Sequence, residues 1–242
     1  MNYRFAETTI RISSMYERVH LLCGNYRTAD GPFSFSVQTT QEDIEFERFK
    51  SKREDLLLKH PIRSFPDSYL EMLAVYRKIA EKMPSFDTVL MHGSCIAVDG
   101  TAYLFTAKSG TGKSTHTRLW RKQFGDRAVM VNDDKPLIRI TDTGAIAFGT
   151  PWDGKHRLSS NIAVPLKAVC ILKRAEKNSI RRITPGEAYP MLLQQIYRPI
   201  DPDAMIKTIA LIDRLTANVD LFLLGCNMDP EAAHVSYEAM KG

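Results

Sequence analysis

The segment Ala107–Ser114 constrains the fold of this 242-residue chain more than any other part of it. It reads AKSGTGKS, follows the apolar run Ala102–Thr106 and leads into Ser114–Phe124, which has the composition of a helix. A glycine-rich run between a strand and a helix matches the Walker A pattern of phosphate-binding loops, with Ala107 in place of the first glycine. We therefore predict an α/β fold in which a buried strand delivers this loop to the start of a helix.

Each part of the loop has a physical reason to bind phosphate. Backbone N–H groups at a helix N-terminus attract anions, and glycines let the backbone approach without a Cβ clash. Lys113 is expected to reach the β- and γ-phosphates, and Ser114 to offer its hydroxyl to Mg²⁺. The alternative is a glycine-rich turn that contains a lysine by chance. We predict ATP and Mg²⁺ as ligands. The expected nucleotide-binding residues are Ser109, Gly110, Thr111, Gly112, Lys113, Ser114 and Thr115.

Two adjacent carboxylates, Asp133 and Asp134, follow the next apolar run, Ala128–Val131. In phosphate-loop proteins an acidic residue at the end of a strand holds the metal, and a second carboxylate can accept a proton from a hydroxyl nucleophile. The expected metal ligands are Ser114 and Asp134, although spacing alone leaves the roles of the two aspartates interchangeable. The alternative is a turn or a helix cap, which Asn and Asp also favour.

The order of these motifs resembles a known family. Met91-His92-Gly93-Ser94, a turn at Asp99-Gly100, the phosphate loop and the acidic pair resemble the catalytic domain of bacterial HPr serine kinase/phosphorylase over roughly residues 86–175. The core of that family is also similar to ATP-dependent phosphoenolpyruvate carboxykinase. The resemblance implies a P-loop core with a mixed sheet and serine as the phosphoryl acceptor. It also implies a homo-oligomer, and catalytic roles for His92, Lys113, Asp133 and Asp134. Without the adjoining motifs, we would interpret His92 as a structural histidine.

The segment Gly149–Ser159 departs from the family pattern, because the glycine-rich signature of true HPr kinases is absent. It is closer to small HPr-kinase-like proteins found beside peptide-modification genes. Lys155 and Arg157 are the candidate substrate-contacting cations, with a solvated basic loop as the alternative. Gly149 and Gly154 are expected to let the loop move. Arg118, Arg121 and Lys122 are expected on the solvated face of the preceding helix.

Two parts of the chain are predicted: a small β-rich unit with a helix over residues 1–84, and a P-loop catalytic domain over residues 85–242. Residues 3–40 alternate in polarity and indicate a small antiparallel β unit. Residues 41–59 are charge-rich without a clear period, and we expect an edge strand and a loop there. Pro66-Asp67-Ser68 opens a helix that Pro84 ends.

Beyond residue 84 the pattern alternates between strands and helices. Hairpins are expected at Asp99-Gly100 and at Asp142-Thr143-Gly144. Expected late elements are strands at 165–172 and 221–225 and helices at 185–195, 204–216 and 230–240.

The composition limits the partners. Thirty-three Lys and Arg against 28 Asp and Glu give a net charge of +5, which suits an anionic ligand but is too small to indicate nucleic acid. The four cysteines lie far apart without metal-binding spacing, so we expect reduced core residues in a cytoplasmic protein. No apolar run approaches 18 residues, so no membrane association is expected.

Together these features predict an ATP- and Mg²⁺-dependent kinase. Its acceptor is a hydroxyl group, serine in first place, on a protein, peptide or small molecule. Two alternatives stay open: a carboxykinase-like enzyme acting on a small carboxylic acid, and a nucleotide-binding regulatory protein without transfer activity.

Overall fold

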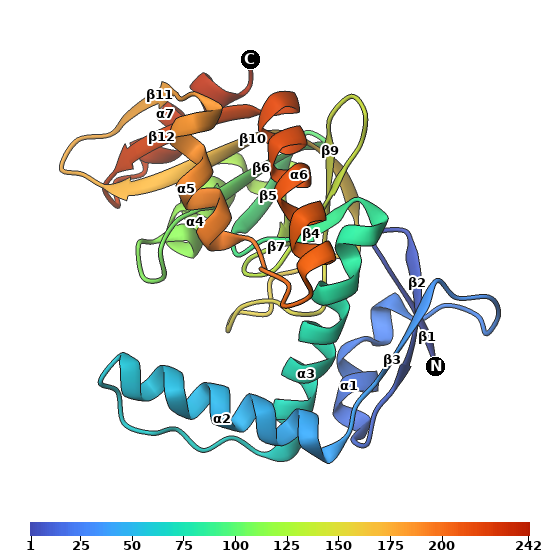
Figure 1. The fold of residues 1–242 in the computed structure, drawn as a ribbon. Coiled ribbons are helices and arrows are strands. Elements are labelled where there is room, and N and C mark those ends of the chain that lie inside the picture. Colours follow the sequence, from blue (N-terminus) through green and yellow to red (C-terminus); the bar gives the residue numbers. More distant parts are fainter. The chain divides into compact units, whose positions relative to one another are not determined.

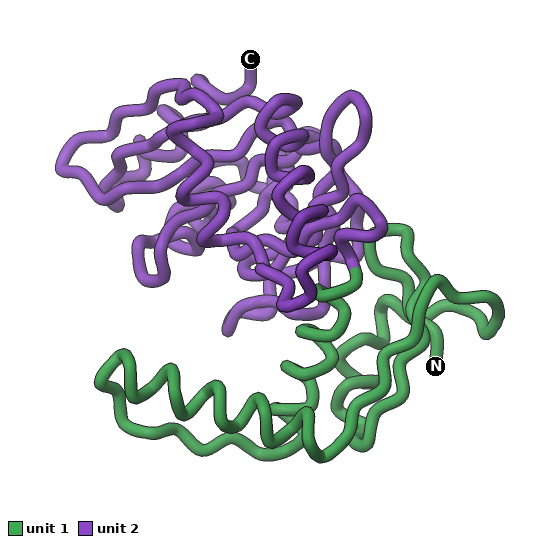
Figure 2. Tube along the Cα trace, in the orientation of Figure 1, with its two compact units in different colours: residues 1–82 green, residues 83–242 purple.

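The computed structural model describes residues 1–242, with seven α-helices and twelve strands (Figure 1). The strands are β1 (Asn2–Phe5), β2 (Thr8–Ser13), β3 (Phe35–Gln38), β4 (Thr88–Leu90), β5 (Ser94–Val98), β6 (Thr101–Thr106), β7 (Ala128–Asn132), β8 (Leu137–Ile140), β9 (Ala145–Phe148), β10 (Ala163–Arg174), β11 (Ser179–Arg182) and β12 (Asp220–Cys226). The helices are α1 (Glu17–Leu22), α2 (Gln41–Leu57), α3 (Asp67–Lys82), α4 (Lys113–Phe124), α5 (Pro185–Gln195), α6 (Pro202–Asn218) and α7 (Glu231–Met240). The chain divides into two units, residues 1–82 and 83–242 (Figure 2).

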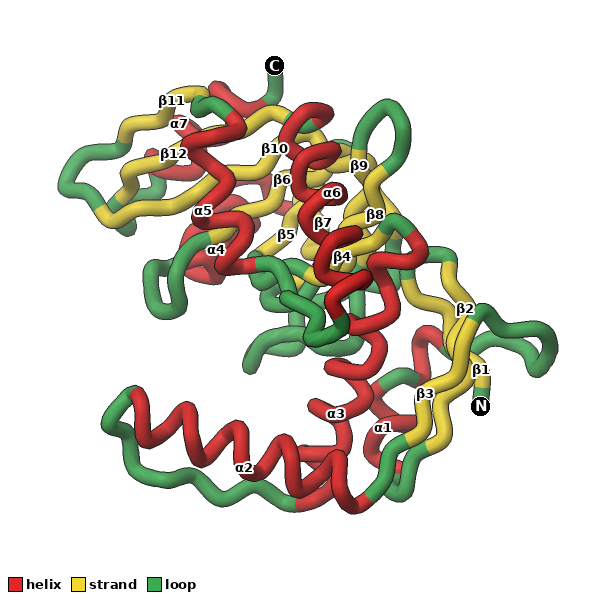
Figure 3. The backbone as a smooth tube through the Cα atoms, viewed as in Figure 1, coloured by secondary structure: helices red, strands yellow, loops and turns green.

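The first unit contains a three-stranded sheet in the order β1-β2-β3. β1 and β2 are antiparallel, but β2 and β3 are parallel. The predicted all-antiparallel arrangement is therefore wrong. Parallel neighbours need a crossover connection, and α1 lies in that connection, where the sequence pattern had suggested an extended segment. The prediction of a β-rich unit is also wrong, because α1, α2 and α3 contain more of its residues than the strands do (Figure 3).

Helix α2 occupies the segment for which we expected an edge strand and a loop. A capping box between Thr40 and Asp43 starts this helix. Ion pairs attach it to α3: the Arg77 guanidinium lies 2.6 Å from the Glu47 carboxylate and 3.0 Å from that of Asp43. Because charged side chains make much of this contact, the segment lacks the apolar period that normally reveals a packed helix. Helix α3 matches the prediction for the segment after Pro66.

The second unit is built on a curled, mixed nine-stranded sheet. Seven strands follow the order β4-β8-β9-β10-β6-β5-β7, while β12 pairs with β10 and β11 pairs with β12. β6, β10 and β12 are parallel neighbours, and the other pairs are antiparallel. The predicted mixed α/β arrangement is confirmed, and so are both hairpins. At the first hairpin Asp99 and Gly100 have φ of 50° and 77°, as a two-residue turn of this type requires. Strand β11 was not predicted.

Alternate residues of the central strands face two separate apolar cores, as the two-residue period of a strand requires. Cys95, Leu104 and Val169 point to the core that α5 and α6 cover. Ile96, Phe105 and Cys170 point to the opposite core, which α4 and α7 cover. The sheet is therefore covered by helices on both faces, and the positions left for polar chemistry lie at the ends of its strands.

All four cysteines are free, and Cys23, Cys95 and Cys170 are buried. Burial raises the pKa of the Cys23 thiol to about 12. None of the helices has the length and apolar character needed to cross a lipid bilayer.

Candidate active site

Three segments reach one edge of the sheet because β5 runs antiparallel to both of its neighbours. Ser94, at the start of β5, pairs with Phe105 near the end of β6, and Cys95 pairs with Asn132 at the end of β7. The residue before β5, the loop after β6 and the residues after β7 therefore share this edge. β6 and β7 end at this edge, whereas β5 begins there because it runs in the opposite direction. His92, which precedes β5, therefore lies beside the loop that follows β6.

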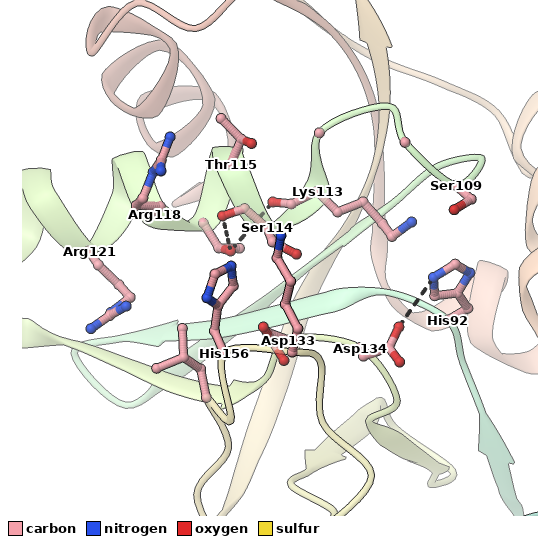
Figure 4. A pocket seen from close by; sticks show the side chains of 15 residues that line it. His92, Ser109, Lys113, Ser114, Thr115, Arg118, Arg121, Asp133, Asp134 and His156 are labelled. Atoms are coloured by element: carbon pink, nitrogen blue, oxygen red, sulfur yellow. Dashed lines mark hydrogen bonds and ion pairs between the residues drawn. The ribbon is translucent and has the colours of Figure 1, made fainter. Parts of the chain in front are cut away.

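A pocket of about 920 Å³ opens at this edge (Figure 4). It is lined by His92, Ser109, Gly110, Gly112, Lys113, Ser114, Thr115, Thr117, Arg118, Arg121, Asp133, Asp134, Lys155, His156 and Leu158. Most of the residues singled out from the sequence thus come together. Thr111 and Arg157 do not line this pocket. Thr111 lines a neighbouring one, and Arg157 is exposed, with its guanidinium 3.9 Å from the Asp153 carboxylate.

The glycine-rich loop has the backbone that its sequence demands. Gly110 and Gly112 have φ of 76° and 123°, and Gly112 immediately precedes the first residue of α4. The Lys113 ammonium is mostly buried and donates to the Ala107 carbonyl over 3.0 Å. Burial lowers the pKa of Lys113, and the Asp134 carboxylate opposes this by raising it. Arg174, which the sequence did not single out, donates to the carbonyls of Gly110 and Thr111 and holds the loop from the end of β10.

The acidic pair sits on a turn that Asn132 organises. Its side-chain oxygen accepts from the N–H groups of Asp134 and Lys135 at 2.8 and 2.6 Å. Its amide nitrogen donates to the carbonyl and the hydroxyl of Thr150, each at 3.0 Å. Asn132 and Thr150 are completely buried. No sequence pattern indicated a role for Thr150, and Asn132 was interpreted only as part of a turn.

The two aspartates have different surroundings. Asp134 lies 3.3 Å from the Nε2 atom of His92 and 3.9 Å from the Lys135 ammonium. Burial opposes its ionisation, but the His92 hydrogen bond and the charges of Lys135 and Lys113 outweigh it, so the pKa of Asp134 is lowered. Asp133 accepts a 2.6 Å hydrogen bond from the Gly154 N–H. Burial is the main reason that the pKa of Asp133 is raised, and nearby Asp153 and Asp134 add to the effect.

The backbone of the His92 segment is tied to the acidic turn. The Gly93 N–H donates to the Asp134 carbonyl over 3.0 Å, and the His92 carbonyl accepts from the Thr106 hydroxyl over 2.9 Å. A Cβ on Gly93 would lie 2.7 Å from the Leu104 side chain, so a glycine is required beside β6. The His-Gly pair therefore combines a side chain that faces Asp134 with a residue small enough to let that segment approach the sheet.

The segment 149–160 packs closely against the end of β7. Ser160 N–H donates to the Val131 carbonyl, and Val131 is the extra residue of a β-bulge opposite β5. A Cβ on Gly149 would lie 1.8 Å from the Ser160 carbonyl oxygen, and one on Gly154 would lie 2.9 Å from both Asp133 carboxylate oxygens. Neither glycine has a positive φ. Both glycines are therefore required because other groups approach them closely, and movement of this loop stays a prediction.

Arg118 and Arg121 line the pocket from α4, although we expected them only on a solvated face. Both are exposed to solvent, so that part of the expectation holds. Their spacing from Ser114, at four and seven residues, would have placed them on the Ser114 face of the helix.

The donor atoms at this edge suit a hard cation. No group of three or more His, Cys, Asp or Glu side chains with metal-binding geometry is present in the described chain. The Ser114 hydroxyl and the Asp134 carboxylate are oxygen donors in one pocket. Mg²⁺ typically binds through one or two carboxylates, with phosphate and water supplying the other ligands. The residues present therefore fit a magnesium–phosphate ligand.

Comparisons with known proteins give one family match. A model of the family described as "SynChlorMet cassette protein ScmC" matches residues 66–200. No curated protein matches the sequence. Among solved structures, the chain is similar to the Hpr(Ser) kinase/phosphatase from Coxiella burnetii, with 11% identity and a TM-score of 0.36, over 63% of this chain and 99% of that chain.

Proposed function

We propose that this chain, which belongs to the family of SynChlorMet cassette protein ScmC, is an ATP- and Mg²⁺-dependent kinase. It transfers the γ-phosphoryl group to a hydroxyl, serine in first place, of a protein, peptide or small molecule. One observation supports this most directly: a single pocket is lined by the glycine-rich loop, by Lys113, by both aspartates and by His92. Phosphoryl transfer needs these parts, namely a phosphate cradle, a cation-binding carboxylate and a proton acceptor.

The loop and Lys113 bind the phosphates in this proposal. The left-handed backbone at Gly110 and Gly112 lets successive N–H groups turn toward an anion at the start of α4. Lys113 exchanges its bond to the Ala107 carbonyl for one to phosphate oxygen. Because burial disfavours the isolated ammonium, its charge gains more from a phosphate partner than an exposed lysine would.

Ser114 and Asp134 would hold Mg²⁺, which when bound supplies positive charge against the phosphate oxygens. Asp134 suits this role because its lowered pKa keeps the carboxylate ionised. His92 holds the Asp134 carboxylate in position through their 3.3 Å contact.

Asp133 is assigned as the proton acceptor. Its pKa is raised, which brings it nearer to the working pH than an ordinary carboxyl, and a general base works best there. The Gly154 N–H fixes one carboxylate oxygen, and the other accepts the hydroxyl proton. The acceptor oxygen then bonds to the γ-phosphorus while the bond from that phosphorus to the bridging oxygen breaks, so ADP leaves.

Nucleotide binding is tested first, by thermal unfolding with ATP and Mg²⁺. Lys113→Ala should abolish the upward shift in Tm, because a ligand stabilises only the state to which it binds. Lys122→Ala is the matched control, since Lys122 lies on the same helix, is exposed and does not line the pocket. A normal shift in Lys113→Ala would exclude the assigned phosphate site.

Transfer is tested with the aspartates. Asp133→Asn and Asp134→Asn should fold normally, because an amide can accept the same hydrogen bonds. Each should lose phosphoryl transfer, or basal ATP hydrolysis, by about a hundredfold or more. Asp126→Asn, in an exposed turn after α4, is the control. Near-full activity in both pocket variants would contradict the kinase mechanism. ATP binding without acceptor-dependent ADP release would favour a regulatory protein instead.

A further inference from the structure

Three cations of the pocket have no partner within the protein. Arg118, Arg121 and Lys155 are exposed and line the pocket, and none of them makes a hydrogen bond or an ion pair in the described chain. Two other exposed arginines are paired: Arg127 with Asp99, and Arg181 with Glu187. The pocket contains the carboxylates of Asp133 and Asp134, but these face Gly154 and His92. The positive charge of these three side chains is therefore unmatched.

The two arginines continue a line of side chains that starts at the phosphate loop. Ser114, Arg118 and Arg121 are separated by four and three residues, so they lie on one face of α4. With a rise of 1.5 Å per residue, Arg121 is about 10 Å along the helix axis from Ser114. The loop amides that bind phosphate lie at the N-terminus of this helix, so the arginines extend the positive charge away from the nucleotide phosphates.

The other wall of this region comes from the segment 149–160. Lys155, His156 and Leu158 line the pocket there, and Figure 4 shows His156 between Asp133 and the two arginines. His156 and Asp133 line the same part of the pocket (Figure 4). The positively charged end of the pocket therefore begins beside the assigned proton acceptor, while the contact between Asp134 and His92 lies at the other end.

We propose that the acceptor is an acidic peptide segment, with carboxylates close in sequence to the hydroxyl residue. Arg118, Arg121 and Lys155 bind those carboxylates. This rests on the proposed kinase function. A hydroxyl beside Asp133 places the adjoining part of its molecule between α4 and the segment 149–160. The distance of about 10 Å along α4 from Ser114 to Arg121 matches about three residues of extended peptide, at roughly 3.3 Å per residue. Matched charges at such a surface select among partners and accelerate their association.

The first test measures binding rather than chemistry. Three fluorescent serine peptides that differ only in their flanking residues, Glu, Gln or Lys, are titrated with the full chain, Mg²⁺ and a non-hydrolysable ATP analogue. The Glu peptide should bind about tenfold more tightly than the Gln peptide, and the Lys peptide most weakly. Raising the salt concentration to about 0.5 M should reduce the difference, because exposed charges are screened. Equal binding, or tightest binding of the Lys peptide, would overturn the proposal.

The second test uses variants. Arg118→Gln combined with Arg121→Gln should remove the preference for the Glu peptide, whereas Lys122→Gln should retain it. Affinity for ATP with Mg²⁺, followed by thermal shift, should change little in the double variant. If ATP affinity falls in parallel with peptide affinity, the arginines serve the nucleotide and the proposal is wrong. If glycerol 3-phosphate is phosphorylated more efficiently than the Glu peptide, the acceptor is a small anion, and the peptide assignment is overturned.

The two proposals fail differently. If the Glu preference is present and the double variant abolishes it, but no peptide is phosphorylated, the kinase function is wrong and the anionic ligand stands. If a peptide is phosphorylated without regard to flanking charge, the kinase function stands and the acidic acceptor is wrong.

Discussion

Single uncharged residues position the charged ones in this pocket. Asn132 uses both ends of its side-chain amide to hold the turn that carries the acidic pair. The Gly154 N–H donates to the Asp133 carboxylate over 2.6 Å. A larger residue at position 154 would displace this carboxylate. The direction in which the carboxylates point thus depends on neighbours that perform no chemistry themselves.

We predict that Gly154→Ala lowers activity more than stability. The new Cβ would lie 2.9 Å from both Asp133 carboxylate oxygens, so the carboxylate must rotate away and its bond to the N–H of residue 154 is lost. Misplacing a reacting group by a fraction of an ångström to an ångström reduces turnover by about tenfold to a hundredfold. Gly144→Ala is the control, since no atom lies within 4 Å of its added Cβ. Steady-state rates and melting curves compare the two, and equal activity would contradict the role of Gly154.

We predict that His116 makes the free energy of unfolding depend on pH. It is buried beside α7, where its Nε2 atom accepts from the Trp120 indole N–H at 3.1 Å. Burial lowers the pKa of His116 to about 4. The unfolded chain, with a histidine pKa near 6.5, binds the proton first, so the contribution is complete above about pH 6.5 and is lost as the pH falls toward 4. At pH 5 the loss is about 2 kcal/mol.

Melting curves at pH 7.5 and pH 5 test this. The decrease in Tm between the two should be several degrees smaller in His116→Gln than in the unmodified chain, because glutamine does not titrate in this range. The comparison uses the change with pH, so a lower Tm of the variant at neutral pH does not affect it. An equal decrease in both proteins would exclude His116 as the source.

Much of the pocket could be predicted from sequence, because its charged residues lie in short motifs at the ends of apolar runs. Lys113, the acidic pair and His92 all line the pocket. Thr150 and Arg174 could not be predicted, since each reaches the site through tertiary contacts with residues 18 and more than 60 positions away. The close contacts at Gly149 and Gly154 could not be predicted, because in a sequence a glycine that avoids a clash cannot be told from one that gives flexibility.

Among the elements, α2 shows how ion pairs can replace an apolar face. The Glu47 side chain is almost fully buried, and Arg77 of α3 lies 2.6 Å from it. Arg48, on the solvated side, pairs with Glu45 and Asp67 but keeps 40% of its side chain exposed. Arg77 and Arg48 thus make two ion pairs each. Those of Arg77 are mostly buried, and those of Arg48 are exposed to solvent.

We predict that Arg77→Ala destabilises the first unit by about 2 kcal/mol, because it leaves the Glu47 carboxylate buried without its main partner. Arg48→Ala, the matched control, should destabilise the unit less than Arg77→Ala does, since exposed ion pairs contribute little. Urea unfolding followed by circular dichroism measures both. Similar losses in the two variants would show that burial of this ion pair does not determine its contribution.

Elements with a clear period were predicted well, and those without one were not. The strands and helices after residue 84 follow apolar runs and turn residues, and both hairpins lie where predicted. Strand β11 has three of its four residues exposed, so its sequence lacks a strand pattern. The parallel pairing of β2 with β3 depends on α1 between them, which is a property of the connection and not of either strand.

For the whole molecule, the second unit contains every part that the proposed function needs. All residues of the pocket lie between His92 and Leu158, and both apolar cores of the sheet are formed within residues 89–240. A unit with its own core can fold on its own. The first unit contributes no residue to this pocket.

We predict that residues 83–242, produced alone, fold and show the same ATP–Mg²⁺ shift in Tm as the full chain. Circular dichroism and thermal unfolding with and without nucleotide measure this, and the Lys113→Ala version of the fragment is the control. An unfolded fragment, or a folded one without the shift, would mean that residues 1–82 are needed for the nucleotide site.

Strand β5 has a consequence for how this pocket moves over time. All five of its residues are buried, and it is paired along its length with β6 on one side and β7 on the other. Amides in such a strand exchange with solvent deuterium only when the whole unit unfolds. Their exchange should therefore be among the slowest in the chain. It should slow further, by one common factor for all amides of the strand, when ATP and Mg²⁺ bind, because the ligand stabilises only the folded state. The separation between the loop and the acidic turn, about two strand spacings or 10 Å, would then stay constant through each turnover of the proposed kinase. Changes in exchange beyond the common factor should be confined to the loop and to the segment 149–160.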